Sequence, residues 1–285
     1  MHNLLLAIFF SSCIIVTFRL FSILRIDNLQ AITANYLIAA ILSFLTWQGD
    51  FSFSELPCRS WFPLSMVNGV FFILVFFVFA RSAQKAGVAI TAVASKMSVI
   101  IPVGIGFLIY GDHLSILKIA GILTAFPAFY LVFKKENKPL EPNKKYILLP
   151  LILFLGTGTN DSVMKHAQKF YVGDEYLLFL GVVFTFSLFI GMGFLIHKLI
   201  KTRQTINVRN IIAGFLLGFF NFASTYFFLR GLAIFESSVF FPIFNVSIVS
   251  MGALIGLVIF KEKLGWKNWL GIILAIITIL FIAMA

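Results

Sequence analysis

Residues 77–125 read FVFARSAQKAGVAITAVASKMSVIIPVGIGFLIYGDHLSILKIAGILTA, and residues 227–275 carry the same pattern. A shift of 150 residues superposes the two stretches without a gap. An internal repeat of this length predicts that the chain consists of two halves with a shared fold. The matched positions include Phe77 with Phe227, Ala83 with Ala233, Val99 with Val249, Gly106 with Gly256, Leu114 with Leu264, and Gly121 with Gly271.

The beginnings of the two halves also correspond, at an offset of 146 residues. FFSSCIIVTFR, which ends at Arg19, matches LGTGTNDSVMK, which ends at Lys165. Between the halves lies the polar segment KKENKPLEPNKK, whose two prolines are typical of a linker. We therefore divide the chain into a first repeat (1–133), a basic linker (134–145) and a second repeat (146–285).

The composition is that of a membrane protein. Of the 285 residues, 60% are hydrophobic and only 12% are charged, whereas a soluble domain is about one quarter charged. Apolar runs of about 20 residues predict membrane-spanning helices, because in lipid every backbone polar group has to be hydrogen-bonded within its own segment. The sequence holds ten such runs, at roughly 4–24, 30–48, 61–81, 87–109, 114–133, 146–168, 176–199, 209–230, 237–260 and 266–284.

The predicted fold class is therefore an all-α polytopic membrane protein with ten transmembrane helices. Each repeat contains five of them, and an odd number of spans forces two homologous halves to insert in opposite orientations. The result is a pair of inverted five-helix repeats. This arrangement is typical of secondary transporters, which bind their substrate near the middle of the membrane between the halves.

Two loop motifs carry a family resemblance. IYGDHLSILKIAG (109–121) and IFKEKLGWKNWLG (259–271), with the segments that precede them, resemble the drug/metabolite transporter (DMT) superfamily, and the two halves resemble tandem EamA domains. The resemblance covers essentially the whole chain. It implies a ten-helix transporter of small metabolites but not which metabolite. Asp112 stands where the family usually has Glu in the first acidic loop, which is a small departure.

Lys96 is the central candidate for the transport site. It lies about nine residues from one end of the run 87–109 and thirteen from the other, too deep for its side chain to reach the membrane surface. Ser95 precedes it, and Pro102 frees a backbone carbonyl in the same run. We expect Lys96 and Ser95 to contact the substrate. A structural lysine, satisfied by carbonyls or by Asp161, is the alternative that the sequence leaves open.

Asp161 is the only acid well inside an apolar run, where it follows Asn160 in GTGTND (156–161). A carboxylate at this depth is expected to bind a proton or a substrate amine. The alternative is an ion pair with Lys165, which is four residues later on the same helix face. We place both Asn160 and Asp161 in the predicted substrate site.

Asn221 and Asn245 complete the predicted substrate-binding set. Asn221 shares one helix face with Gly214 and Gly218, whose lack of side chains allows a close neighbour. Asn245 aligns with Ser95 across the repeat, which predicts that the two line one cavity from opposite halves. Either asparagine can instead be a hydrogen bond between helices. Secondary candidates are Asn35, Tyr36 and Asn68.

The main functional hypothesis is a secondary transporter, acting as exporter, importer or exchanger of a small metabolite by alternating access between the two repeats. The first alternative is a flippase for a lipid or a lipid-linked group on the same fold. A membrane-embedded enzyme is disfavoured, because the sequence has no zinc motif, no paired intramembrane carboxylates and no Ser/His/Asp set. The sequence also lacks the GxxxxGK[ST] motif, so ion coupling or facilitated exchange is expected rather than ATP.

The expected partners are a small-molecule substrate, a coupled proton and membrane lipid. The net charge of +11 does not indicate nucleic acid, because the basic residues are scattered over short loops beside the spans. No cofactor and no metal site are expected, since Cys13 and Cys58 lack the spacing of metal ligands. We expect a monomer in the cell membrane, with a bacterial inner membrane as its setting.

Two arguments about orientation disagree. Fifteen Lys and Arg residues lie in the loops that follow odd-numbered spans, and five lie on the opposite side. Because basic loops prefer the cytoplasm, this imbalance places the linker inside and both termini outside. The family resemblance implies the reverse. The charge count is the larger signal, so we predict outside termini.

Overall fold

The computed structural model describes residues 2–102, 104–105, 115–133, 144–203, 205–234 and 237–284. Within these ranges every regular element is helical and no strand is present, as the apolar runs predict. The loop that contains Asp112 lies outside the described residues, and so do residues 134–143 of the expected linker.

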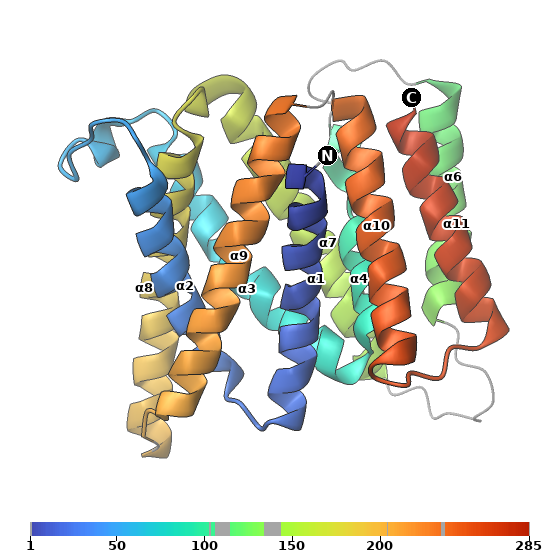
Figure 1. Ribbon diagram of the computed structural model, residues 1–285, viewed down its shortest axis with the longest axis horizontal. Helices are drawn as coiled ribbons and strands as arrows, with labels where there is room; N and C mark the ends of the chain where they lie inside the picture. Colours follow the sequence, from blue (N-terminus) through green and yellow to red (C-terminus); the bar gives the residue numbers. More distant parts are fainter. Residues whose placement is uncertain are drawn as a thin grey trace. The chain divides into compact units, whose positions relative to one another are not determined.

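Ten long helices follow one another through the described residues (Figure 1). A short 3₁₀ turn, η1 (Leu56–Cys58), precedes the third of these helices, and a π-helical turn, η2 (Gln168–Val172), follows the sixth. The helices are α1 (His2–Ile23), α2 (Asn28–Thr46), α3 (Phe62–Lys85), α4 (Val88–Met97), α6 (Ile116–Phe133), α7 (Lys144–Ala167), α8 (Tyr176–Thr202), α9 (Val208–Ile234), α10 (Ser237–Val258) and α11 (Trp266–Ala283).

Apart from the fourth, each expected span corresponds to one of these helices. Among the described residues, five helices are long and apolar enough to cross a membrane, namely α1, α2, α3, α8 and α9. Shorter apolar helices occupy Val88–Pro102, Phe244–Val258 and Trp266–Phe281. The chain is thus a helical membrane protein with several spans, and the count of ten remains a prediction.

The fourth span is not the continuous helix expected over residues 87–109. Regular α-helix ends at Met97, a turn covers residues 98–99, and helical backbone resumes at Ile100. Pro102 explains the break, because it lacks the N–H that would bond the Ser98 carbonyl and its ring crowds that carbonyl. The Ser98 carbonyl instead accepts a hydrogen bond of 2.9 Å from the N–H of Ile101.

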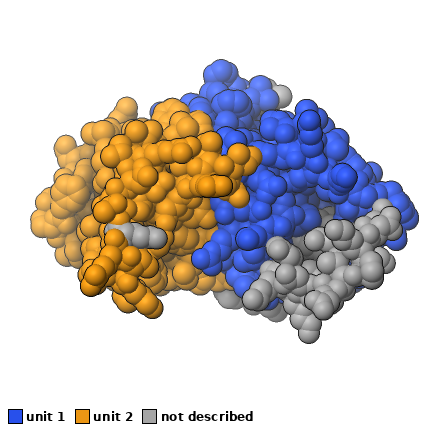
Figure 2. Space-filling model, turned by 90° about the horizontal axis from the view of Figure 1, so that it is seen from below, with its two compact units in different colours: residues 1–20, 78–158, 224–285 blue, residues 21–77, 159–223 orange. Residues whose placement is uncertain are grey.

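The chain forms two compact units, each of which contains helices from both halves of the sequence (Figure 2). Unit 1 comprises residues 1–20, 78–158 and 224–285, and unit 2 comprises residues 21–77 and 159–223. These units are groups of packed helices, whereas the predicted repeats are continuous stretches of sequence. The units therefore do not test the division of the sequence into two repeats, which stays a prediction.

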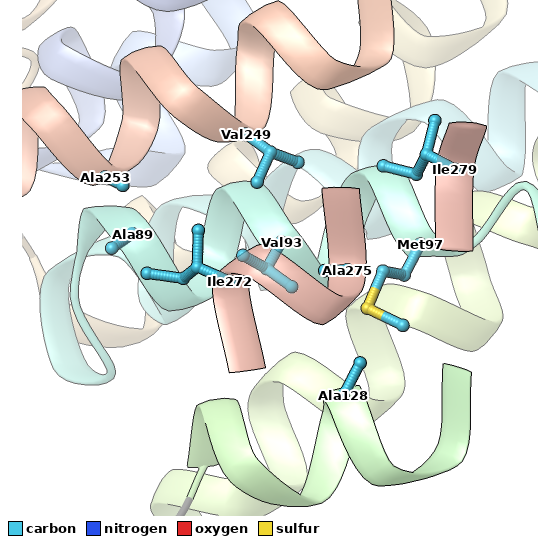
Figure 3. Packing of buried hydrophobic residues seen from close by; sticks show 9 residues of the cluster. All are labelled: Ala89, Val93, Met97, Ala128, Val249, Ala253, Ile272, Ala275 and Ile279. Atoms are coloured by element: carbon cyan, nitrogen blue, oxygen red, sulfur yellow. The ribbon is translucent and has the colours of Figure 1, made fainter. Parts of the chain in front are cut away.

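Unit 1 is held together by an apolar cluster between four helices (Figure 3). Its members recur every three or four residues, so each helix contributes one face. Small side chains alternate with branched ones, which suits a membrane interior, where close packing rather than exclusion of water drives association. The cluster consists of Ala89, Val93 and Met97 of α4, Ala128 of α6, Val249 and Ala253 of α10, and Ile272, Ala275 and Ile279 of α11.

Two helix pairs within unit 1 run antiparallel. The start of α4 meets the loop after α10, and a Cβ atom on Gly252 of α10 would lie only 2.4 Å from that of Ala92. The hydroxyls of Thr124 on α6 and Thr278 on α11 are 2.9 Å apart. Nearer the start of α11, the Asn268 amide donates to the Leu131 carbonyl at 3.3 Å. In Figure 1, α6 and α11 accordingly lie side by side.

Unit 2 contains a third antiparallel pair, α2 with α8. A Cβ on Gly181, near the start of α8, would lie 2.9 Å from the ring of Phe44 near the end of α2. Further along, a Cβ on Gly191 would lie 2.9 Å from the hydroxyl of Thr33. Each glycine thus admits a larger side chain of α2, and the order of contacts fixes the opposite direction of the two helices.

The three pairs share one property. In the sequence alignment of the halves, α2 corresponds to α8, α4 to α10 and α6 to α11. Each of these helices therefore packs, in the opposite direction, against its own counterpart from the other half.

Candidate functional site

The start of α4 depends on an acid from the second half of the chain. Gly87, the residue before the helix, has a φ of +105° and no side chain to cap it. Oε1 of Glu262 accepts the Val88 N–H at 2.7 Å instead, and Oε2 accepts that of Ala89 at 3.4 Å. A Cβ on Gly87 would lie 3.0 Å from both carboxylate oxygens, so glycine fits this position in both space and φ. Glu262 is the acid of the second loop motif.

The end of α4 carries Lys96. The Ser98 hydroxyl donates to the Ser95 carbonyl at 2.5 Å, and the Val99 N–H approaches the Lys96 carbonyl at 3.4 Å. Lys96 therefore occupies the last turn of a helix whose terminal carbonyls carry partial negative charge, which favours a cation there. The helix break thus lies immediately beside the deepest lysine of the sequence.

The ammonium group of Lys96 faces an aromatic ring. Its Nζ is 4.6 Å from the ring centre of Phe244 on α10, a buried residue of unit 1. Such a cation–π contact contributes about 2 kcal/mol when desolvated, and the helix terminus adds about 0.3–1 kcal/mol. Because Lys96 is only partly buried, together they offset a part of the cost of about 2.5–3.5 kcal/mol for a lysine at the centre of a membrane. Lys96 is therefore tolerated here, and its depth alone does not assign a substrate to it.

Ser95 and Asn245 lie at the same level of unit 1, next to Lys96 and Phe244 respectively. Both are almost completely buried, with 8% of their surface exposed. The antiparallel contact of α4 with α10 thus brings three predicted site residues to one level. Their role in substrate binding remains a prediction.

Asn160 and Asp161 belong to unit 2, on the last part of α7. Asn160 is buried, and within the described part of the chain its Oδ1 has no hydrogen-bond partner. Asp161 points differently, since its side chain is exposed, as is that of Lys165. The structure therefore separates the two neighbours, with the amide inside and the carboxylate at the surface of the helix bundle.

Asn221 joins α9 to α2. Its amide donates to Oδ1 of Asn35 at 3.2 Å, and both side chains are buried in unit 2. The approach is close because a Cβ on Gly218 would lie 2.5 Å from the Asn35 carbonyl oxygen, and one on Gly214 would lie 2.3 Å from that of Ala31. Asn221 thus makes the interhelical hydrogen bond that its spacing from the glycines allows.

Both ends of α8 are fastened by polar contacts that sequence reasoning missed. At the start, Glu175 accepts a hydrogen bond of 2.7 Å from the indole of Trp61 and forms an ion pair of 3.0 Å with Arg59. At the other end, Lys198 donates to Asp27. A polar residue before an apolar run was the available signal for Asp27, whose carboxylate caps α2 by accepting from the N–H of Leu29 at 2.9 Å.

The charge of Asp27 is stabilised by these contacts. Partial burial by itself raises the pKa of this carboxyl group. The hydrogen bond from Lys198, the backbone hydrogen bonds from Gln30 and Leu29, and the positive charge of Lys198 outweigh it, so that the pKa of Asp27 lies below its usual value. The ion pair therefore persists at neutral pH.

Arg19 on α1 contacts the backbone at the end of α3. Arg19 Nη1 donates to the Gln84 carbonyl at 2.6 Å and so caps the end of α3. Among the residues that the structure describes, no three His, Cys, Asp or Glu side chains gather as metal ligands would.

The described residues form apolar helices, five of them long enough to cross a membrane, with asparagine side chains buried between them, and these features define the class of multi-pass membrane proteins. Residues 144–284 match the EamA-like transporter family, so the second half of the chain is a domain of that family. This match confirms the predicted resemblance to EamA domains and is consistent with the wider DMT superfamily. Over 283 residues the chain is also 27% identical to an uncharacterized protein of Haemophilus influenzae, covering 97% of this chain and 95% of that protein.

Proposed function

We propose that the protein is a secondary transporter that moves a small metabolite across a cell membrane by alternating access between two inverted repeats. The observation that carries this proposal is the antiparallel packing of α2 with α8, α4 with α10 and α6 with α11. Counterpart helices run in opposite directions when two homologous halves insert with opposite orientations. The same symmetry lets two halves exchange conformations, which is how such transporters expose one site to either side.

The substrate contacts in unit 1 centre on Lys96. Discontinuous helices at mid-membrane expose backbone groups to substrates and ions in secondary transporters, and α4 ends one residue after Lys96. Its ammonium group suits a carboxylate or phosphate of the substrate, while Ser95 and Asn245 supply neutral hydrogen bonds. Displacement of Phe244 from the ammonium group is the local change that substrate binding would require.

The contacts in unit 2 come from Asn160, Asp161 and Asn221. Asp161 is the candidate for the coupled proton, since a carboxylate in a span changes charge when it binds one. The asparagines would bind polar groups of the metabolite. We further propose a monomer in a bacterial inner membrane, a setting supported by the bacterial source of the similar protein.

Uptake by the purified protein in liposomes tests this function. Labelled amino acids, sugars and nucleotide derivatives are screened with and without a pH gradient, and the Lys96→Met variant is measured on any solute taken up. We expect uptake to be lost in Lys96→Met while the melting temperature in detergent stays within a few degrees of the parent. The matched control is Lys267→Met, because Lys267 also lies over an aromatic ring, 5.8 Å from that of Trp266, but at the start of α11.

Unchanged uptake by Lys96→Met contradicts a transport role for this lysine. A collapse of folding in the same variant, with Lys267→Met intact, makes Lys96 a structural residue. The flippase alternative is examined in the same vesicles with a fluorescent lipid quenched from outside. If more of the fluorescent lipid is quenched than the outer leaflet contains, and no solute is taken up, the transported substrate is a lipid and not a small metabolite.

A further inference from the structure

Unit 2 contains buried polar atoms whose hydrogen-bonding capacity is not met within the described part of the chain. Asn68 on α3 is completely buried, and neither Oδ1 nor Nδ2 of its amide has a partner there. On α2, the equally buried Tyr36 hydroxyl and Nδ2 of Asn35 are in the same condition. An unpaired buried polar group costs about 1–3 kcal/mol, so these four atoms together represent several kcal/mol.

This condition is not general in unit 2. The Ser43 hydroxyl, also completely buried, donates to the Ala39 carbonyl at 2.8 Å, and that of Ser187 donates to the Gly69 carbonyl at 2.9 Å. Buried Asn210 donates to Gln30 at 2.9 Å. Side chains of the same kinds are therefore satisfied elsewhere in unit 2. Trp47 Nε1 and Asn160 Oδ1 also lack a partner among the described residues, but Asn68, Tyr36 and Asn35 differ from them in being completely buried.

An aromatic wall connects the two helices that carry these atoms. The ring of Phe76 on α3 is 5.7 Å from that of Tyr36, and the ring of Phe184 on α8 is 6.1 Å from it. Phe72 lies 5.6 Å from Phe184 and one turn after Asn68, on the same side of α3. These rings offer no strong hydrogen-bond partner, so the unmet atoms need one that is not part of this wall.

We propose that Asn68, Tyr36 and Asn35 form a polar site that opens to water during the transport cycle and binds an uncharged hydrogen-bonding group of the solute. This inference rests on the proposed function and names a second contact region for it. The three side chains carry no formal charge and offer both donors and acceptors. A hydroxyl or amide group of the substrate matches them, and an ionised group does not, because it would be left without a counter-charge.

Cysteine accessibility tests the site without knowledge of the substrate. In a background with Cys13→Ser and Cys58→Ser, the Asn68→Cys variant is treated in the membrane with the impermeant thiol reagent MTSET. The matched control is Ile73→Cys, because Ile73 is equally buried on the same helix and packs against Gly191. We expect Asn68→Cys to react about tenfold faster or more, since it is reached whenever the site opens, whereas the control requires local unfolding. Equal rates overturn the proposal.

Radiolytic hydroxyl footprinting of the unmodified protein gives a second measure that does not depend on a folded variant. Hydroxyl radicals formed from water near a side chain should oxidise Tyr36, while Phe184, a buried ring of the aromatic wall itself, stays protected after correction for intrinsic reactivity. Protection of Tyr36 equal to that of Phe184 also overturns the proposal. If the protein takes up solute but its Asn68→Cys variant does not react with MTSET, this polar site is contradicted and the proposed transport function is not.

Discussion

The two units solve the packing problem of a membrane interior in different ways. Unit 1 joins α4, α6, α10 and α11 through small and branched apolar side chains, with Lys96 placed against Phe244. Unit 2 fastens α8 at both ends with ion pairs and leaves unmet polar atoms between them. Apolar packing and clamped ends both bring counterpart helices together. Among the described residues, six buried polar atoms without a hydrogen-bond partner lie in unit 2 and two, Arg19 Nε and Thr157 Oγ1, lie in unit 1. At the usual cost of about 1–3 kcal/mol per group, unit 2 therefore carries the larger cost of unpaired polar groups.

This difference in packing indicates that the two units differ in rigidity and in how much their hydration can change. An interface of interlocking apolar side chains tolerates little sliding, because a shift of one residue misplaces every contact. The ion pairs at the two ends of a helix can break and re-form one at a time. Polar atoms without a hydrogen-bond partner gain one when water or solute enters. We therefore assign the more rigid packing to unit 1 and the larger change in hydration to unit 2.

The largest expected effect comes from the closest backbone approach, which is in unit 2. Gly214→Ala would place a Cβ 2.3 Å from the Ala31 carbonyl oxygen, and backbone cannot move aside as a flexible side chain can. We expect a loss of about 1–3 kcal/mol of stability, as for other overpacked interiors. Thermal unfolding in detergent measures it.

Two further glycines sharpen the comparison. Gly252→Ala in unit 1 meets the Cβ of Ala92 at 2.4 Å and should also lower the melting temperature. Gly193→Ala has nothing within 4 Å and should leave it unchanged or raise it, since alanine favours helix by up to about 1 kcal/mol. A Gly214→Ala variant as stable as Gly193→Ala would mean that α9 does not pack on α2 as described.

A smaller effect is expected at the clamp between α2 and α8. Asp27→Asn keeps a residue able to cap α2 but removes the charge that pairs with Lys198, at a cost of about 1 kcal/mol or less for a partly exposed pair. The pKa of Asp27 is lowered in the folded protein, so its contribution is present above the ordinary aspartate pKa of about 3.9 and is lost as pH falls through the lowered value.

Melting temperatures across pH therefore test the clamp. Asp27→Asn should melt below the parent at pH 7, and the gap should close as the pH falls below about 4. Asp50→Asn, in an exposed loop, is the control and should show no gap at either pH. A gap for Asp27→Asn that is constant with pH would show that the carboxylate charge is not what holds the two helices.

The sequence predicted the helices well because apolar run length has a direct physical cause in the membrane. It also predicted the glycine face that lets Asn221 reach Asn35, since that pattern is local to one helix. Pro102 signalled a disturbance in the fourth span, but the position of the break depends on which carbonyls find other donors. In the structure the Ser98 hydroxyl donates to the Ser95 carbonyl and the Ile101 N–H donates to the Ser98 carbonyl, and these two hydrogen bonds fix the position of the break.

Contacts across the chain were beyond reach of local patterns. Glu262 was recognised as part of a loop motif, yet its role as the cap of α4 joins residues 174 positions apart. Asn68 was only a secondary candidate in the sequence, because the lack of hydrogen-bond partners for its two amide atoms becomes known only once the neighbours of α3 are known. The sequence-predicted residues also divide between the units, with Lys96, Ser95 and Asn245 in unit 1 and Asn160, Asp161 and Asn221 in unit 2.

The central claim is that the two halves are inverted, and two loops of unit 2 test it. The loop between α2 and α3 contains the native, exposed Cys58 and lies at the same end of α8 as Glu175. Its counterpart between α8 and α9 contains Thr205, whose carbonyl accepts from Gln30 at the other end of α8. In a Cys13→Ser background, intact cells are labelled with an impermeant maleimide, using Cys58 in one variant and Thr205→Cys with Cys58→Ser in the other.

Inverted repeats predict that one of the two cysteines is labelled in intact cells and the other only after the cells are opened. The charge count further predicts that Cys58 is the one on the outside, and the family resemblance predicts the opposite choice without disturbing the inversion. Labelling of both cysteines from the same side would contradict the inverted arrangement, and with it the alternating access proposed for this protein.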